Sequence, residues 1–324
     1  MTEISTEFKK EALRQKQALP LEGKIILTEQ RIHEWYNHWG GQVYISFSGG
    51  KDSTVLRDIV KRLYPDVPAV FVDTGLEYPE VRKFATERAD VVLRPKMRFD
   101  EVIKTYGYPV VSKRVASYAS TARRRPDSQR ARWLKGIDKT KFVSAKWAFL
   151  IDAPFAVSAR CCDIMKKKPM KLYQKETQRM PIIGTMACEG ANRENAYLLT
   201  GCNAFSGRQP ASHPLSVWLE QDILQYIKRN GLEIAPVYGE IVERDQLRGQ
   251  TRLFDGEYSE LVTTGAKRTG CMFCMFGAQC EKSPNRFQKM KETHPRQYAY
   301  CMKSVEDGGL GLRDVLDYIG VPYE

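Results

Sequence analysis

A buried-strand pattern that runs directly into a glycine-containing loop and then into a helix is the feature that most constrains this chain. VYISF (43–47) is a short apolar run rich in β-formers, as in a buried strand. SGGKDS (48–53) follows it, and TVLRDIVKRLY (54–64) then places apolar residues at helical spacing. The sequence therefore predicts a strand, a tight turn and a helix in immediate succession.

This turn has the chemistry of a phosphate-binding loop. Two glycines let the backbone approach a phosphate closely, and the free amides at the start of the next helix point at the anion. It is not a Walker A loop, because Ile45 occupies the position of the required glycine and Lys51 is followed by Asp52. An ordinary glycine-rich turn is the alternative. The candidate phosphate ligands are Ser48, Gly49, Gly50, Lys51, Asp52 and Ser53.

The rest of the chain alternates strand and helix patterns, which predicts an α/β fold with an open, mostly parallel sheet flanked by helices. A helical segment with a break near Pro20–Gly23 precedes the loop, and an irregular, cysteine-rich region follows residue 233. We expect three parts: 1–40, 41–232 and 233–324. Further predicted strands are 68–73, 91–95 and 181–185, and further predicted helices are 79–89, 99–107 and 216–231.

Composition narrows the class of protein. The chain has 324 residues, of which 42% are hydrophobic, so it can bury a sizeable core. No run of about 20 apolar residues occurs, and the first residues lack a basic-then-apolar signal. We therefore expect a cytoplasmic protein without a membrane partner. Eight cysteines are too sparse for a disulfide scaffold and favour a metal or redox role.

Positive charge is concentrated in one segment. Lys and Arg number 51 against 39 acids, a surplus of 12, and the segment 113–146 alone holds 11 basic and two acidic residues. A polyanionic partner such as nucleic acid is one interpretation, and a solvated basic face is the other. Trp133, Phe142 and Trp147 are candidates for base stacking or for core packing.

Cysteines form two pairs that are distant in the chain. Cys161 and Cys162 are adjacent, and Cys271 and Cys274 form a CxxC motif. Four thiolates suit Zn²⁺ or an iron–sulfur cluster, and spacing alone does not choose between these and buried free thiols. Three further cysteines are isolated and are expected to be buried: Cys188, Cys202 and Cys301. Three lysines follow the first pair, Lys166, Lys167 and Lys168. They either supply positive charge to the centre or form a solvated face. Met272, Phe273, Met275 and Phe276 are expected to shield the centre or to belong to the core.

Several motifs together resemble one family. SFSGGKDSTVL resembles the PP-loop of the ATP pyrophosphatases, the adenine nucleotide alpha-hydrolase-like group. Landmarks similar to those of the phosphoadenosine phosphosulfate (PAPS) reductase family occur in that family's order: FVDTGLEYPEV (71–81), YGYPVVSKR (106–114), CCDIMKKKP (161–169) and HPLSVWLEQDILQYI (213–227).

The resemblance implies roles for particular residues. An adenine nucleotide would lie across the carboxyl ends of the strands, with its phosphates in the loop and with Asp73, Thr74 and Gly75 near it or near Mg²⁺. Asp73 is equally interpretable as a cap. Lys113, Arg114 and Arg193 would contact the nucleotide, although the first two belong to the basic segment and Arg193 has Glu189 and Glu194 as nearby ion-pair partners. Lys51, Asp52 and Asp73 are the catalytic candidates.

The CC…CxxC pattern resembles the [4Fe–4S]-binding assimilatory sulfonucleotide reductases. This implies a cluster held by Cys161, Cys162, Cys271 and Cys274, with Cys280 as a substitute for Cys161 or Cys162. Two departures bear on the reaction. The tail ends in GLGLRDVLDYIGVPYE, with no cysteine of the ECGLH type, and the loop is a full SGGKDS, where those reductases carry a degenerate one.

Three hypotheses follow. The first is ATP-dependent, adenylylating sulfur transfer to a polyanionic acceptor such as nucleic acid, as in the DNA phosphorothioation and tRNA thiolation enzymes that this plan resembles. The second is reduction of PAPS or adenosine phosphosulfate (APS) to sulfite, with thioredoxin or glutathione as the donor. The third is a nucleotide- or nucleic-acid-binding accessory protein with a structural cluster. The first two imply a sulfur or electron donor as a partner.

Overall fold

The structure is a computed structural model that describes residues 6–140, 143–207, 209–244 and 260–324. The chain forms two compact units that alternate along the sequence. Unit 1 takes the described parts of Met1–Asp73, Tyr78–Leu93 and Met170–Thr269, and unit 2 takes those of Thr74–Glu77, Arg94–Pro169 and Gly270–Glu324. These units do not coincide with the expected boundaries at residues 40 and 232. In particular, 94–169 groups with the C-terminal region rather than with the phosphate loop.

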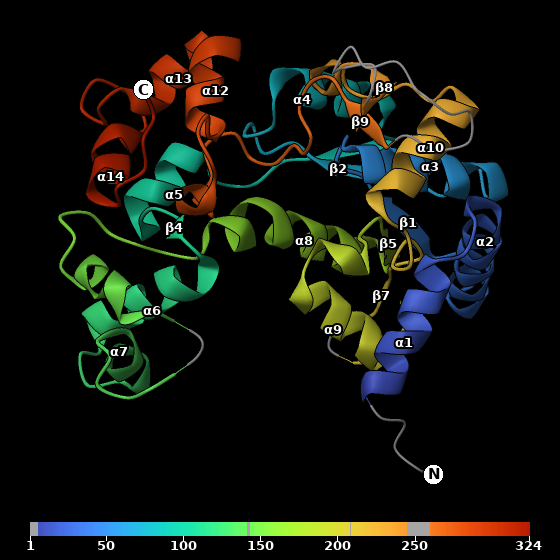
Figure 1. Cartoon of the computed structure of the whole chain (residues 1–324), viewed down its shortest axis with the longest axis horizontal. Coiled ribbons are helices and arrows are strands. Elements are labelled where there is room, and N and C mark those ends of the chain that lie inside the picture. The colour runs from blue at the N-terminus through green and yellow to red at the C-terminus, as the bar shows by residue number, and fades with distance from the viewer. Residues whose placement is uncertain (1–5, 141–142, 208, 245–259) are drawn as a thin grey trace, which may run out of the picture. The chain divides into compact units, whose positions relative to one another are not determined.

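Unit 1 is built on a six-stranded sheet with the strand order β3-β2-β1-β5-β7-β6. Strands β2, β1, β5 and β7 of this sheet are labelled in Figure 1. The pairs β3–β2, β2–β1, β1–β5 and β5–β7 are parallel, and only the edge pair β7–β6 is antiparallel. The predicted α/β class and the four predicted strands are confirmed. The strands are β1 Val43–Ser46, β2 Ala69–Val72, β3 Val91–Leu93, β5 Met180–Ile183, β6 Asn203–Ala204 and β7 Ala211–Ser212.

Alternation along β1 places side chains on both faces of the sheet, and both faces are covered. Val43 and Ile45 join the main core with residues of α2, α3, α4 and α10, whereas Tyr44 packs with Val70 and with Tyr173 of α8. A strand that is buried on both faces explains why VYISF reads as a continuous apolar run.

The helices of this unit are α1 Thr6–Gln17, α2 Leu21–His38, α3 Lys51–Leu63, α4 Pro79–Arg88, α9 Ala191–Thr200 and α10 Glu220–Asn230. Smaller elements are the 3₁₀ turns Ala187–Glu189 and Pro236–Tyr238 and the antiparallel pair β8 Ile241–Glu243 and β9 Leu261–Thr263. Helix α8, Lys168–Thr177, begins in unit 2 and continues into unit 1.

The helix predicted over 216–231 begins later than expected, at Glu220. Asp222 fixes this start, because its Oδ2 accepts a hydrogen bond from the Leu219 amide at 2.6 Å and pairs with the buried Lys24 Nζ at 2.6 Å. The preceding Trp218 is fully buried, and its Nε1 donates to Thr28 Oγ1 at 2.8 Å. The helix ends at Gly231, which is left-handed with φ +58°, as predicted.

Unit 2 is mainly helical. Among its described residues, β4 Val110–Val111 pairs with β10 Met275–Phe276, and this parallel pair joins the two halves of the unit. The remaining elements are α5 Phe99–Tyr106, α6 Lys113–Arg124, α7 Gln129–Leu134, the 3₁₀ turns Ala145–Ile151 and Ala278–Cys280, the π-helical turn Asp163–Lys167, α12 Arg286–Thr293, α13 Pro295–Met302 and α14 Leu312–Tyr318.

The C-terminal region is more regular than the sequence predicts. Residues 264–285 form turns and very short elements, whereas 286–318 form three helices whose buried residues include Leu312, Val315 and Leu316. Each helix has only seven or eight residues, which is too short for periodicity to reveal it. Among the described helices, none is both long and apolar enough to cross a membrane.

Candidate functional site

The phosphate loop of unit 1 lies at the carboxyl end of β1, between the ends of β2 and β5. Residues 47–50 connect β1 to α3, and Asp73 and Gly184 directly follow β2 and β5. Because the three strands are parallel, their carboxyl ends share one edge of the sheet. The structure therefore brings the loop and Asp73 to the same edge, as the sequence predicts.

Hydrogen bonds within the loop hold it in one shape. Ser53 Oγ donates to Gly50 O at 2.9 Å and accepts from the Ser48 amide at 3.2 Å, and the two serine hydroxyls lie 3.0 Å apart. Gly50 caps α3 in an extended conformation, so the first helical amides project from the end of the helix. The two serines thus brace the loop: Ser53 is buried, and Ser48 is exposed with a hydroxyl that can also contact a phosphate.

Gly49 is required by both conformation and space. Its φ is +73°, and a Cβ there would lie 2.8 Å from the Cβ of Ala85 and 3.0 Å from the carbonyl oxygen of Val81. The loop is therefore packed directly against α4. Gly184 is equally close to the loop from β5, since a Cβ at this residue would lie 3.0 Å from the Asp52 carbonyl oxygen.

Lys51 is buried and has its own partners. Its Nζ lies 2.8 Å from Glu220 Oε1 and 3.0 Å from the Lys267 carbonyl oxygen, and it sits 5.6 Å from the centre of the Tyr238 ring. Tyr238 is held by a 2.5 Å hydrogen bond to Thr269 Oγ1. In this arrangement Lys51 ties the start of α3 to α10 and to the 267–269 segment.

Asp52 lies in a mixed electrostatic field. Burial raises the pKa of its carboxyl group, and the negative charge of Glu220 raises it further. The positive charges of Lys51, Arg268 and Arg193 lower it. Two arginines outside the loop thus act electrostatically on Asp52. Sequence reasoning identified Arg193 and missed Arg268, because RTG lies far from the loop in the chain and has no distinctive pattern.

Arg193 and Arg268 share one carboxylate. The Arg193 guanidinium pairs with Glu189, and Arg268 Nη1 lies 3.8 Å from the other oxygen of Glu189. Burial and the charge of Arg268 both lower the pKa of Arg193. Around the loop, the cationic groups of Lys51, Arg193 and Arg268 thus lie with the carboxylates of Asp52, Glu189 and Glu220. Guanidinium groups are well suited to bind phosphate.

Cys188 is the second residue that sequence reasoning misjudged. It was expected to be buried, but it is exposed on the turn that precedes Glu189, with its Sγ 3.5 Å from the Trp218 carbonyl oxygen. Desolvation raises the pKa of its thiol. The positive charge of Arg268 lowers that pKa, and the negative charges of Asp52 and Glu220 raise it. The thiol therefore belongs to the surroundings of the phosphate loop.

Asp73 is nearly fully buried and forms a two-point ion pair with Arg82. The Arg82 Nε and Nη2 atoms lie 2.6 and 2.8 Å from its two carboxylate oxygens. Thr74 Oγ1 donates to the carboxylate of Glu77, 2.7 Å from Oε1, and Gly75 adopts φ +70° in open space. Asp73 is thus tied to α4 by this ion pair. Thr74 and Gly75 open the short unit 2 segment Thr74–Glu77.

Unit 2 gathers the two cysteine pairs. Burial raises the pKa of Cys161 far above its ordinary value, and the next contributions come from Cys162, Cys271 and Cys274. The CxxC turn is closed by a 3.2 Å hydrogen bond from the Cys274 amide to the Cys271 carbonyl, and β10 continues it alongside β4. Cys161 and Cys162 open a helix that becomes π-helical at Asp163, a distortion that is common at functional sites.

Lys166 joins this group, whereas its two neighbours do not. Burial raises the pKa of Cys271 to about 11, opposed by Lys166, which hydrogen-bonds to the thiol. The Lys166 Nζ also lies 3.6 Å from Glu77 Oε1. Lys167 pairs with Asp163 at 2.8 Å, and both Lys167 and Lys168 are exposed. Of the three lysines, Lys166 therefore supplies positive charge at the thiols, and Arg286 supplies more at Cys274.

The remaining cysteines differ in environment. Cys280 is exposed and accepts a 3.5 Å hydrogen bond from Gln279 Nε2, Cys301 is fully buried, and Cys202 is half-buried. Met272, Phe273 and Met275 are buried in unit 2, and Phe276 is half-buried. Within the described ranges, no three His, Cys, Asp or Glu side chains form a group that could hold a metal ion.

The basic segment of unit 2 combines exposed cations with stacked rings. Tyr118 and Trp133 stack at 5.8 Å, Arg130 lies over Tyr118, and Lys146 lies over Trp147. Lys113 and Arg114 open α6 and are exposed. Phe142 lies outside the described residues.

Comparison with known proteins decides the family. The model of the phosphoadenosine phosphosulfate reductase domain matches residues 42–110 and 126–275. The chain belongs to this family. Its relatives include an uncharacterized protein of Methanocaldococcus jannaschii, 24% identical over 86% of this chain and 51% of that protein. The phosphoadenosine 5′-phosphosulfate reductase of Escherichia coli O157:H7 is 24% identical over 65% of this chain and 71% of its own length.

Among solved structures, the phosphoadenylyl-sulfate reductase of Candida auris in complex with phosphate covers 80% of this chain and 98% of its own, with 14% identity and a TM-score of 0.38. The chain spans about half the length of the Methanocaldococcus relative.

Proposed function

We propose that this PAPS reductase family member is an ATP-dependent sulfurtransferase whose acceptor is a nucleic acid. The observation that carries the proposal is the loop Ser48–Ser53: it is complete, it is cross-braced by its two serines, and Arg193 and Arg268 act on its central Asp52. A loop that only bound the 5′-phosphosulfate of PAPS would have no β- and γ-phosphates to neutralise. The intact Lys51 and Ser53 of the loop fit a triphosphate better.

The proposed reaction has two displacements. An acceptor oxygen attacks the α-phosphorus of ATP, an O–P bond forms, and pyrophosphate leaves with the electrons of the broken P–O bond. A sulfide-level sulfur nucleophile then attacks the acceptor atom that bears the adenylylated oxygen, and AMP leaves. The loop amides and the two arginines stabilise the charge that develops on the phosphates. Mg²⁺ would share that charge in the ATP complex.

The thiols of unit 2 have a donor set that fits an iron–sulfur cluster. Cys161 is buried, and Cys162, Cys271 and Cys274 are half-buried. As thiolates they would repel one another, and a cationic centre stabilises thiolates in such a group. Each thiolate of a [4Fe–4S] cluster binds a different iron, so the donors need not converge as tightly as around one ion. Cys161, Cys162, Cys271 and Cys274 would hold it. When bound, a cluster would supply an iron able to carry sulfide or an electron.

A second candidate is reduction of PAPS or APS to sulfite. The similarity to the E. coli reductase over 65% of this chain favours it. Exposed Cys188, beside the phosphate loop, offers a thiol for attack on a sulfonucleotide.

One experiment separates the two. Anaerobically purified protein is incubated in parallel with ATP, PAPS and APS. A nucleic acid acceptor, sulfide and reduced glutathione as the electron donor are present in each reaction, and pyrophosphate and sulfite are measured. Pyrophosphate from ATP that depends on the acceptor supports sulfur transfer. Sulfite from a sulfonucleotide supports the reductase, and Cys188→Ser then tests the attacking thiol.

A further inference from the structure

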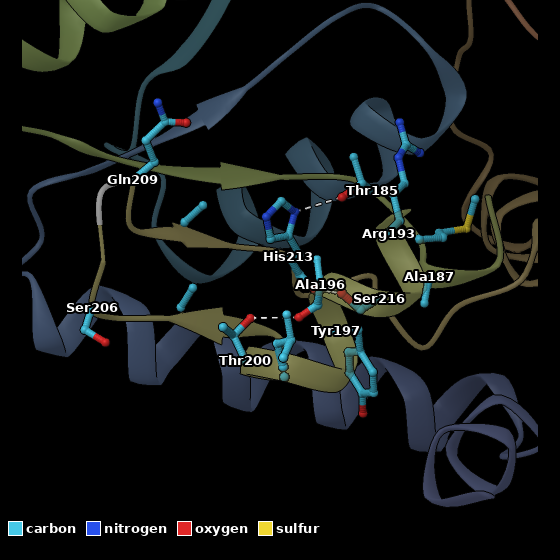
Figure 2. Close-up of a pocket in the computed structure, with 15 residues that line it drawn as sticks. Thr185, Ala187, Arg193, Ala196, Tyr197, Thr200, Ser206, Gln209, His213 and Ser216 are labelled. Carbon is cyan, nitrogen blue, oxygen red and sulfur yellow. Dashed lines mark hydrogen bonds between the residues drawn. The ribbon is translucent and has the colours of Figure 1, made fainter. Parts of the chain in front are cut away.

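A cavity of about 350 Å³ lies in unit 1 beyond the phosphate loop, on the β5–β7 side of the sheet. We call it the α9 pocket. Helix α9, the β6–β7 hairpin and the loop that follows β5 form its walls (Figure 2). Its size falls in the range of small-ligand pockets. Apart from Arg193, none of its residues has a place in the proposed chemistry at the loop.

Several small side chains line the α9 pocket, beside the larger Met186, Tyr197 and Leu199. Ala204 and Ala211 are directly paired across the hairpin, so they present their methyl groups on one face. Ala196 and Thr200, one helical turn apart on α9, line the same cavity. Small residues on these two elements leave room for a ring between them, in a cavity of about 350 Å³.

His213 gives the pocket a hydrogen-bonding group without a charge. Its Nδ1 lies 2.8 Å from Thr185 Oγ1, as Figure 2 shows. Burial and the nearby Arg193 lower the pKa of the imidazole, so the ring is neutral at pH 7. In either tautomer, its other nitrogen has no hydrogen-bond partner within the part of the chain that the structure describes, and it can donate or accept accordingly.

Further uncommitted polar groups lie at the turn of the hairpin. The Gln209 amide and the Ser206 hydroxyl both line the pocket and have no hydrogen-bond partner among the described residues. An amide can donate and accept at adjacent atoms, which is the pattern that reads the edge of a nitrogen heterocycle.

Charge is confined to one end. Arg193 is the charged residue among those that line the pocket, and its guanidinium also pairs with Glu189. Arg193 also acts on Asp52 of the phosphate loop, so its guanidinium marks the end of the pocket nearest the loop. A ligand with a neutral planar part and an anionic part directed toward the loop fits this distribution.

We propose that the α9 pocket binds one nucleobase of the nucleic acid acceptor, flipped out of its strand, with the adjoining backbone phosphate at Arg193. The pocket thereby sets which nucleotide is presented to the adenylate. This inference rests on the proposed function for the identity of the acceptor. A flipped base is read by its hydrogen-bonding edge and by contact with apolar walls, and the pocket offers both.

Nucleoside 5′-monophosphates are the probe, and calorimetry is the measurement. The phosphate loop is first saturated with α,β-methylene-ATP, so that a second binding event reports on the pocket. We expect at least one of AMP, GMP, CMP and UMP to bind the loaded protein. Ala196 lines the pocket from an exposed position on α9, so Ala196→Phe places a large side chain in the pocket. This substitution should weaken monophosphate binding at least tenfold and change the affinity for the ATP analogue less than twofold.

Ala191→Phe is the matched control, because Ala191 is exposed on the same helix and does not line the pocket. It should leave both affinities unchanged. His213→Phe should weaken monophosphate binding at least fivefold, and His213→Gln should retain part of it. If none of the four monophosphates binds the loaded protein, or if Ala196→Phe and Ala191→Phe behave alike, the inference is wrong.

The outcomes separate this inference from the proposed function. Pocket-dependent monophosphate binding without release of pyrophosphate from ATP would keep the nucleobase site and remove the sulfurtransferase. Acceptor-dependent release of pyrophosphate that Ala196→Phe leaves intact would keep the enzyme and remove the nucleobase site.

Discussion

The ammonium group of Lys51 lies 2.8 Å from the carboxylate of Glu220, so the only cationic side chain in the phosphate loop is held by α10. Lys51 is buried and Glu220 is about one quarter exposed. To reach a nucleotide, Lys51 must exchange this carboxylate for a phosphate. The pair is therefore a contact that a bound nucleotide competes with.

Glu220→Gln should strengthen ATP binding, because it weakens the competing contact and removes a negative charge near the loop. The expected gain is about 1 kcal/mol, while Lys51→Ala should lose about 1.5–3 kcal/mol. Isothermal titration calorimetry measures both. Asp90→Asn, which breaks the remote Lys61–Asp90 pair at 2.9 Å, is the control and should have no effect. Unchanged ATP affinity in Lys51→Ala would remove this lysine from the site.

Gly49→Ala should destabilise the fold by about 2–4 kcal/mol, because a positive φ and a 2.8 Å contact with the Cβ of Ala85 combine. Gly75→Ala separates the two causes. Its φ is similar, +70°, but nothing lies within 4 Å of the added Cβ, so about 1 kcal/mol is expected. Urea denaturation gives both values. Equal losses would show that the packing of the loop against α4 is unimportant.

Asp52→Asn should stabilise the ligand-free protein at neutral pH. Burial raises the pKa of this carboxyl group, so the folded state binds its proton more tightly than the unfolded state does. The stability that Asp52 contributes is complete below its unfolded pKa and is lost as the pH rises through its folded pKa. The advantage of Asp52→Asn should therefore grow from pH 4 to pH 7.

Denaturation curves across that pH range test the sign, with Asp66→Asn as an exposed control for the same change. ATP-dependent release of pyrophosphate should fall in Asp52→Asn even as stability rises. An advantage that shrinks with pH would contradict the assigned environment.

Serine substitution of the paired cysteines should remove iron. Cys162→Ser, Cys271→Ser and Cys274→Ser should each lower iron and acid-labile sulfide in anaerobically purified protein, because each would leave one iron without its thiolate. Cys202→Ser is the matched control and should retain both. Loss of iron in Cys280→Ser would instead place Cys280 among the ligands. A colourless protein with stoichiometric zinc would overturn the cluster.

Nucleic acid binding through the basic segment should depend steeply on salt. Arg124→Ala, Arg125→Ala and Arg130→Ala should each weaken binding and reduce the slope of log affinity against log salt, by about 0.9 per lost phosphate contact on duplex DNA. Fluorescence anisotropy with labelled duplexes over 50–300 mM salt measures the slope. Arg14→Ala, on α1 and outside the segment, should change nothing. A slope near zero in the unaltered protein would exclude this partner.

Local patterns predicted the sheet and the phosphate loop well, because both depend on short stretches of sequence. An apolar run buried on both faces identifies β1, and two glycines before a helix identify the loop. The start of α10 could not be predicted in the same way. Lys24, almost two hundred residues away, holds the Asp222 that caps it.

Long-range contacts also explain what sequence missed at the site. The charge of Arg268 lowers the pKa of Asp52, and Arg268 lies in a segment whose sequence has no helix or strand pattern. Cys188 lies in the 3₁₀ turn Ala187–Glu189, where it is exposed. Neither depends on neighbours in the chain. That Cys161 and Cys271 belong to one group of thiols was predicted only through a resemblance to a family. The spacing of cysteines in the sequence does not show which distant thiols come together.

The chain passes from one unit to the other five times, at residues 73, 77, 93, 169 and 269. During synthesis, Cys161 and Cys162 emerge from the ribosome long before Cys271 and Cys274 exist. Most of the sheet and the phosphate loop can therefore form before the second pair of cysteines has been synthesised. Insertion of a cluster would thus be a late event in maturation, and no single cut in the gene would yield the two sites as separate, intact fragments.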